Sequence, residues 1–255
     1  MKHHISIDPI TRLEGHGKIE IFLKKDGEVD EVYFQVPELR GFEKFLEGRP
    51  VEEVSQIVTK ICGVCPGCHH MGAGKATDAV FGVEPPPTAR KLRELFYMAH
   101  FVHSHIAHFY ALAAPDFVVG PTAPPGERNI LGVIGKVGKE IGTEVIKQRR
   151  VAQEIQALLG GHQTHVVMNI PGGVRKGLTN EQRDDIEEKA KDFIEFSKFS
   201  LKIFDDVVLA NKDYVDIILN GPYSLNLHSM GVVDKNNYVN FYDGDVRVVD
   251  TEGKE

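Results

Sequence analysis

The sequence contains few cysteines and no long hydrophobic run. Three cysteines in 255 residues are too few for the disulfide framework of small secreted proteins, so we expect a reducing compartment. No segment approaches the roughly 18 consecutive apolar residues of a membrane-spanning helix, and the N-terminus has no apolar core of signal-peptide length. We therefore expect a cytoplasmic protein without a membrane span.

Basic residues are outnumbered by acidic ones, 30 against 37, which gives a formal net charge of −7. This balance argues against a non-specific nucleic-acid binder, because such proteins neutralise phosphates with lysine and arginine. A hydrophobic content of 42% and a charged content of 26% are those of an ordinary soluble globular protein. We find no internal repeat or flexible linker, and we predict a single domain over residues 1–255.

Hydrophobic periodicity predicts a mainly α-helical fold of the α+β class, in which long helices pack as a bundle. Residues 50–220 form the predicted helical core. Thr179 and Gln182 have the spacing of a capping box, which marks a helix start. Helices are predicted over about 51–61, 72–81, 88–113, 127–159 and 180–208.

Two segments predict small β-structures at the ends of the chain. Residues 5–36 are β-rich, and Asp26-Gly27 between two strand-like runs indicates a hairpin with a type I′ turn. Residues 238–250 contain a second hairpin signal around Asp243-Gly244. Because an isolated hairpin is only marginally stable, this segment indicates the opening of a structure that continues.

The three cysteines lie within seven residues, in the sequence ICGVCPGCHH over residues 61–70. Gly63, Pro66 and Gly67 favour a tight turn that aims several sulfurs at one point. Thiolates at two-residue separations are suitable ligands for nickel, zinc or an iron–sulfur cluster. The rest of the chain is expected to form a frame around this turn.

Two other polar segments favour structural roles on residue pattern alone. The charged segment over residues 11–17 is more typical of a solvated loop than of a functional site. His100 and His103 share one side of a predicted helix and His105 and His108 another, at about 100° per residue. The four histidines therefore do not form one metal site, and we interpret them as core or cavity-lining residues.

Several separated motifs resemble, in the family's order, the large catalytic subunit of nickel–iron hydrogenases. The resemblance covers about residues 5–250 and is strongest for the soluble cytoplasmic type linked to ferredoxin, cofactors or heterodisulfide reductase. The motifs are DPITRLEGH at 8–16, RGFE at 40–43, ICGVC at 61–65 followed by His69, HFY at 108–110 and PGGV at 171–174.

The resemblance implies a role for each of five residues. Cys62 would be a terminal nickel ligand and Cys65 would bridge nickel and iron, which suits soft thiolates. His69 would tune a sulfur by hydrogen bonding. Glu43 would bind a magnesium ion, a hard cation that prefers oxygen ligands. Glu14 would relay a proton beside the nickel, as a carboxyl with a raised pKa can.

The implied activity is reversible oxidation of H2 by heterolytic cleavage at a nickel–iron centre whose iron carries carbon monoxide and cyanide. Electrons would leave through the iron–sulfur clusters of a hydrogenase small subunit. The physiological acceptor would be a ferredoxin-, NAD(P)-, F420- or heterodisulfide-reductase-linked module. Maturation proteins would install the diatomic ligands.

The sequence departs from the family pattern in three ways. Lys60 stands where the family usually has arginine, and it lacks the planar fork needed for a bidentate contact. Cys68 is an additional thiol. No cysteine follows Cys68, whereas the family supplies a second cysteine pair near its C-terminus. We expect the 255 residues alone to be inactive, as a fragment or one part of a split subunit.

Two alternatives remain open. In the first, the three cysteines and His69 bind structural zinc or an iron–sulfur cluster, although this leaves Glu14 and Glu43 unexplained. In the second, the chain is a non-catalytic interaction or assembly subunit. Quinone-site subunits of respiratory complex I descend from this fold, but they lack the cysteines that are kept here. Metal content separates the first alternative from a hydrogenase.

Overall fold

The computed structural model describes residues 3–221 and 225–255. Long helices dominate it and its sheets are small, so the predicted fold class is confirmed. The chain divides into two compact units, Met1–Ala113 with Ala152–Gly177, and Ala114–Val151 with Leu178–Glu255. Every helix within the described ranges is too short or too polar to span a membrane.

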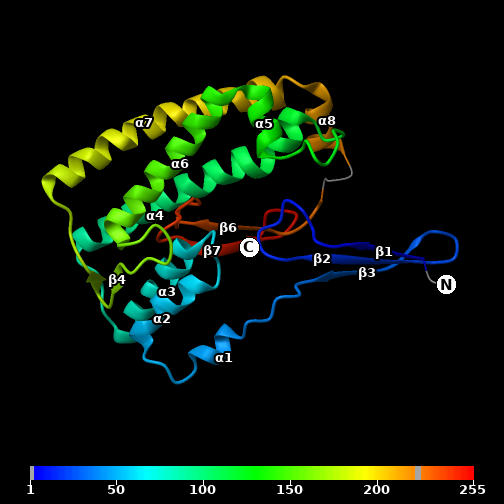
Figure 1. The fold of residues 1–255 in the computed structure, drawn as a ribbon. Coiled ribbons are helices and arrows are strands. Elements are labelled where there is room, and N and C mark those ends of the chain that lie inside the picture. Colours follow the sequence, from blue (N-terminus) through cyan, green and yellow to red (C-terminus); the bar gives the residue numbers. More distant parts are fainter. Residues whose placement is uncertain (1–2, 222–224) are drawn as a thin grey trace. The chain divides into compact units, whose positions relative to one another are not determined.

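The first unit combines a three-stranded sheet with a group of helices (Figure 1). Its strands are β1 (His3–Ile7), β2 (Lys18–Leu23), β3 (Val29–Gln35), β4 (Asn169–Ile170) and β5 (Gly173–Val174). Its helices are α1 (Phe42–Leu46), α2 (Val51–Ile57), the 3-10 helix η1 (Val58–Lys60), α3 (Pro66–Phe81), α4 (Pro87–Ala107) and the π-helical segment η2 (His108–Ala113). The last turns of α6 (Lys139–Gly160) complete it.

The second unit is mostly helical and contains one hairpin. Its helices are α5 (Ile130–Val137), the first part of α6, α7 (Asn180–Phe204), α8 (Lys212–Asn220) and the π-helical segments η3 (Pro115–Val119) and η4 (Asp205–Leu209). Its hairpin pairs β6 (Ser229–Val233) with β7 (Asp245–Val249). The predicted capping box is confirmed, because Thr179 and Gln182 bond to each other's backbone N–H at the start of α7.

Three predicted helix boundaries were wrong. The helix predicted from residue 72 begins at Pro66, where a proline in the first turn lacks only an N–H that would be unpaired anyway. Cys68 and His69 therefore lie on α3 rather than in a turn. The helix predicted over 127–159 is divided at Gly138, whose φ of 94° interrupts helical backbone. The helix predicted over 88–113 ends at Ala107 and continues as η2.

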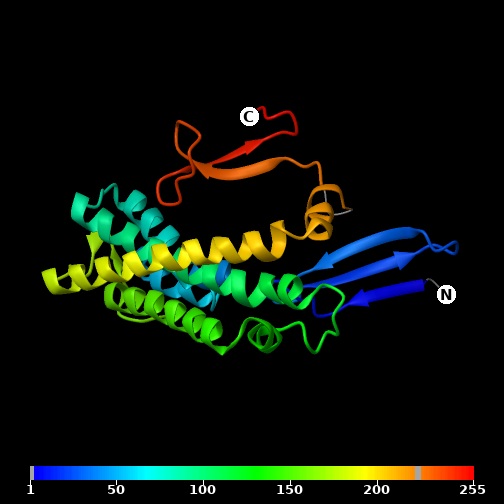
Figure 2. The same cartoon turned by 90° about the horizontal axis from the view of Figure 1, so that it is seen from above.

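The N-terminal sheet is antiparallel in the order β1-β2-β3, and the three strands lie side by side in Figure 2. The hairpin around Asp26-Gly27 is confirmed. Its turn is not type I′, because that turn needs positive φ at both central residues and only Gly27 has it. The side chain of Asp26 instead accepts a hydrogen bond from the Glu28 N–H at 3.2 Å.

The C-terminal hairpin differs from the predicted one. β7 pairs with Ser229–Val233 rather than with residues 238–242. Asp243-Gly244 is not the hairpin tip, because the side chain of Asn240 accepts hydrogen bonds from the backbone N–H groups of Tyr242 and Asp243 and forms a local turn there.

A buried ion pair organises the core of the first unit. Arg93 on α4 is fully buried and forms a bidentate ion pair with Asp78 on α3. The same guanidinium donates to the carbonyl oxygens of Ile170 at 3.0 Å and Gly173 at 2.7 Å. Asp78 also accepts the N–H of Gly172 at 2.7 Å. These contacts fix the PGGV motif against α3 and α4.

The four histidines of the long helix separate as its geometry predicts. His100 and His103 are 2% and 6% exposed and lie in the core. Burial lowers the pKa of His100, whose ring faces the amide oxygen of Gln156 at 3.2 Å. His105 and His108 are exposed, so the core interpretation was wrong for these two.

Candidate functional site

Cys62 is at the centre of the candidate site. It lies just after η1 and is buried. Its sulfur accepts hydrogen bonds from the backbone N–H groups of Val64 at 3.4 Å and Cys65 at 3.2 Å. Two backbone N–H donors are thus aimed at one sulfur, and a cysteine binds a metal as its thiolate.

Glu14 reaches this sulfur from a segment 48 residues away, and the Cys62 thiol donates to its Oε1 at 3.3 Å. The loop that carries Glu14 is closed by the hydrogen bond from Ile10 N–H to the Gly17 carbonyl at 3.0 Å. Gly17 is buried, and a Cβ there would overlap the side chain of Leu13. The charged segment over residues 11–17 is thus largely exposed to solvent yet folded against the cysteine turn.

Cys65 and Cys68 lie at the start of α3, where Cys65 is the N-cap. Burial raises the pKa of Cys65 to about 12, and the hydrogen-bonded Cys62 adds to the shift. Burial also raises the pKa of Cys68, while the Tyr97 hydroxyl that bonds to its sulfur acts in the opposite direction. A metal that binds at Cys65 must therefore displace a proton.

His70 was not singled out by sequence reasoning, although it is fully buried beside the cysteine turn. Its Nδ1–H donates to the Ser55 carbonyl at 2.8 Å. Its Nε2 accepts the N–H groups of Met168 at 3.1 Å and Asn169 at 2.9 Å. Burial lowers its pKa, so the neutral ring links α2, α3 and β4. Its place in the motif, directly after His69, was the only signal that could have found it.

Three predicted site residues are not drawn into this arrangement. Glu43 is exposed on α1 and Lys60 is exposed at the end of η1. His69 is half-buried on α3, and within the described residues its side chain has no hydrogen bond to a sulfur. Magnesium binding by Glu43 and hydrogen bonding by His69 to a sulfur stay predictions, as does the role of Lys60 at the family's arginine position.

Few metal donors come together at the cysteine turn in the described part of the chain. Cys62 and Cys65 supply two soft sulfur donors of the kind that nickel and iron bind, and Glu14 supplies a carboxylate beside them. Over residues 3–221 and 225–255, no group of three or more His, Cys, Asp or Glu side chains is placed to hold a metal ion. Two thiols and one carboxylate are the kinds of donor that could form part of a nickel–iron site.

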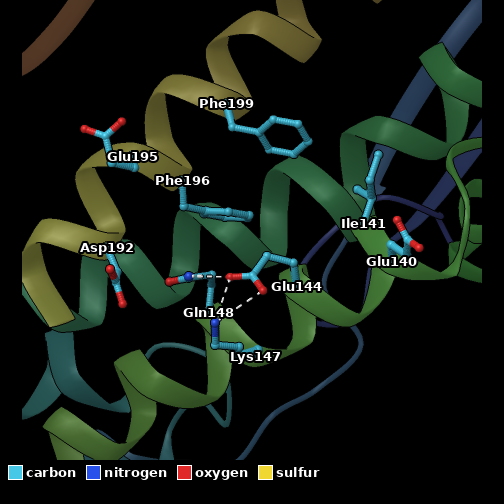
Figure 3. Close-up of a pocket in the computed structure, with 9 residues that line it drawn as sticks. All are labelled: Glu140, Ile141, Glu144, Lys147, Gln148, Asp192, Glu195, Phe196 and Phe199. Atoms are coloured by element: carbon cyan, nitrogen blue, oxygen red, sulfur yellow. Dashed lines mark hydrogen bonds and ion pairs between the residues drawn. The ribbon is translucent and has the colours of Figure 1, made fainter.

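A groove of about 420 Å³ lies between α6 and α7 in the second unit (Figure 3). Glu144 projects into it and bonds to Lys147 and Gln148, while Phe196 and Phe199 project from α7. It contains none of the sequence-predicted site residues. Its lining is Glu140, Ile141, Glu144, Lys147, Gln148, Asp192, Glu195, Phe196 and Phe199.

Comparison with known proteins gives a consistent result. Residues 40–123 match the family described as nickel-dependent hydrogenase, and residues 4–39 match the family described as HoxL-like. The chain is 46% identical over 251 residues to the iron-sulfur subunit of an F420-non-reducing hydrogenase from Archaeoglobus profundus. It is 42% identical over 258 residues to the vhu subunit of an F420-non-reducing hydrogenase from Methanocaldococcus jannaschii.

Solved structures agree with the sequence comparison. An NAD+-reducing [NiFe]-hydrogenase in the H2-reduced state superposes with a TM-score of 0.89 at 32% identity, over 98% of this chain and 55% of that one. The Ni-Fe-Se hydrogenase of D. vulgaris Hildenborough superposes with a TM-score of 0.74 at 29% identity, over 100% of this chain and 53% of that one.

The chain spans only about half the length of these relatives. Both sequence alignments cover 98% of this chain, but 52% of the A. profundus protein and 59% of the M. jannaschii protein. The cysteine turn and the Glu14 loop both lie inside the matched regions. The chain is therefore similar, over almost its whole length, to the N-terminal part of nickel-dependent hydrogenase large subunits.

Proposed function

We propose that this chain is the N-terminal half of a hydrogenase large subunit that catalyses reversible oxidation of H2. The observation that carries the proposal is the 3.3 Å contact between Cys62 Sγ and Glu14 Oε1. It joins a proton acceptor to the buried sulfur that would bind a metal, which is the pairing that heterolytic cleavage of H2 needs.

In this proposal Cys62 and Cys65 would hold the nickel–iron centre, with Cys65 as the ligand common to both metals. When bound, that centre would supply Lewis-acid and redox chemistry towards H2. Glu14 Oε1 takes the proton from Cys62 Sγ and passes it towards solvent, because its loop is exposed. Glu43 would bind magnesium, and His69 would tune a ligand sulfur by hydrogen bonding.

The remaining metal ligands and the electron path come from other polypeptide. Relatives of about twice this length, and the few metal donors at the cysteine turn in the described part of the chain, support a missing second ligand pair. The electron-transfer partner in this proposal is an iron–sulfur small subunit, and the location is the cytoplasm. The names of the A. profundus and M. jannaschii relatives favour an acceptor other than F420, such as a ferredoxin- or heterodisulfide-reductase-linked module.

Replacing Cys65 tests the assignment of the centre. The chain would be co-expressed with the C-terminal half of the A. profundus relative, maturation proteins and a matching small subunit, and nickel and iron would be counted in the purified assembly. Cys65→Ser is expected to lose both metals and all H2 oxidation, because a bridging thiolate serves both ions. Cys68→Ser is the matched control and should keep them. Full nickel and iron in Cys65→Ser would contradict the bridging role, and zinc alone in the unmodified assembly would overturn the function.

Replacing Glu14 tests the proton path separately. Glu14→Gln keeps the size and the hydrogen-bonding oxygen but cannot take up a proton at that position. We expect full metal content and H/D exchange slowed by about 100-fold or more, the usual scale of general acid–base catalysis. Exchange at the unmodified rate, with the metals retained, would remove Glu14 from the path.

A further inference from the structure

We propose that Arg40 and His165 are positioning residues that clamp the backbone directly before Cys62. Arg40 donates through one guanidinium nitrogen to the Lys60 carbonyl at 3.4 Å and through the other to the Ile61 carbonyl at 2.5 Å. His165 Nδ1 donates to the Thr59 carbonyl at 3.0 Å. Three successive carbonyls before the cysteine are thus held by side chains from distant parts of the chain.

These carbonyls need such partners because of their place in the fold. They end the α2–η1 helix, and the last carbonyls of a helix have no N–H partner within it. Positively charged side chains are favoured at this end, where the helix dipole is negative. Thr59 is only 1% exposed, so water is poorly placed to replace His165. The sequence supplies both donors from outside the helix.

Both clamp residues are themselves held in place. The Arg40 guanidinium lies over the ring of Phe42, 5.7 Å from its centroid, and 3.8 Å from a Glu38 carboxylate oxygen. His165 adopts a left-handed backbone conformation with a φ of 56°, which is uncommon for a residue other than glycine. Strained conformations of this kind persist where surrounding contacts fix them, and they concentrate at functional sites.

The clamp decides where the Cys62 sulfur lies. Cys62 follows the last clamped carbonyl, and its sulfur must meet Glu14 and two N–H groups at once. If the carbonyls are released, the peptide before Cys62 can rotate and the sulfur moves away from Glu14. The part-buried His165 contact should matter more than the Arg40 contact, because Arg40 is half exposed and its bonds compete with water. The geometric role stands by itself, and only its importance for catalysis rests on the proposed function.

The test measures the approach of residue 14 to Cys62 in the 255-residue chain without metals. Glu14→Cys is introduced together with Cys65→Ser and Cys68→Ser, so that two thiols remain. The short bifunctional thiol reagent dibromobimane fluoresces when both of its ends react, and mass spectrometry confirms the 14–62 cross-link. Its yield relative to single alkylation reports how often the two positions meet.

Matched substitutions isolate each arm of the clamp. Asn at position 165 tolerates the left-handed backbone and keeps an N–H donor near the imidazole Nδ1 position, whereas Asp has the same shape with an acceptor there. We expect His165→Asn to keep most of the cross-linking and His165→Asp to lower it about tenfold. Arg40→Met should lower the cross-linking yield about threefold. Arg40→Lys should give a yield between those of Arg40→Met and of the parent chain with Arg40 intact.

The control is Arg49→Met. Arg49 also lies over an aromatic ring, 4.4 Å from the Phe45 centroid, and 3.7 Å from a Glu53 oxygen, but it contacts none of the three carbonyls. Far-UV circular dichroism checks that every variant is folded. Equal cross-linking in His165→Asn and His165→Asp would overturn the clamp. That result would leave the proposed function untouched, because the function is judged by the nickel and iron content of the complete assembly.

Discussion

The buried pair of Arg93 and Asp78 allows a sharp prediction about stability. Replacing Asp78 by alanine leaves a fully buried guanidinium without its counter-ion and the N–H of Gly172 without its acceptor. Removing one partner of a buried ion pair costs about 3–5 kcal/mol, against a typical total stability of about 5–15 kcal/mol. Asp78→Ala should therefore remove a large share of the free energy of unfolding.

The double variant distinguishes an ion pair from simple loss of packing. Arg93→Met with Asp78→Ala removes both charges, and the remaining cost is the unpaired carbonyls of Ile170 and Gly173 and the N–H of Gly172, about 1–3 kcal/mol each at most. We expect the double variant to be more stable than the sum of the single changes predicts, by about 2 kcal/mol. The two substitutions are non-additive because each single variant leaves one unpaired charge in the core, whereas the double variant leaves none.

Urea unfolding followed by far-UV circular dichroism measures these free energies, since the chain has no tryptophan for fluorescence. The exposed pair of Arg183 and Asp184 is the matched control, and breaking it should cost less than about 1 kcal/mol. Additive effects of the two core substitutions, within about 0.5 kcal/mol, would refute the account of a buried ion pair that fixes the PGGV motif.

Two further predictions concern α7 and the buried histidine. Thr179→Ala should lower the free energy of unfolding by about 1 kcal/mol, because it removes the N-cap bond of α7, and Ser at the same position should restore it in the same urea assay. His70 has a pKa lowered by burial, so its neutral form contributes stability that is present above the unfolded pKa of about 6.5 and is lost as the pH falls below it. Stability measured in urea at pH 7.5, 6.5 and 5.5 should decline towards acid less steeply in His70→Gln than in the unmodified chain; equal slopes would show that His70 is not the titrating group.

Much of the fold could be predicted because its determinants are local. The apolar periodicity of the helices, the Thr179 capping box and the Asp26-Gly27 hairpin each depend on residues within a few positions. The errors were local too, but they involved competing signals. Pro66 began a helix inside a glycine-rich segment that favoured a turn, and Gly138 divided a helix that hydrophobic spacing alone made continuous.

The sequence by itself determined the composition of the site: a cysteine turn, a carboxylate-bearing loop and the motifs that identify the family. Only the tertiary structure brought Glu14 to Cys62, and placed Arg40 and His165 on the carbonyls before it. These contacts join residues 20 to 106 positions apart. No local propensity encodes such pairings, because they depend on how helices, strands and loops pack once the chain has folded.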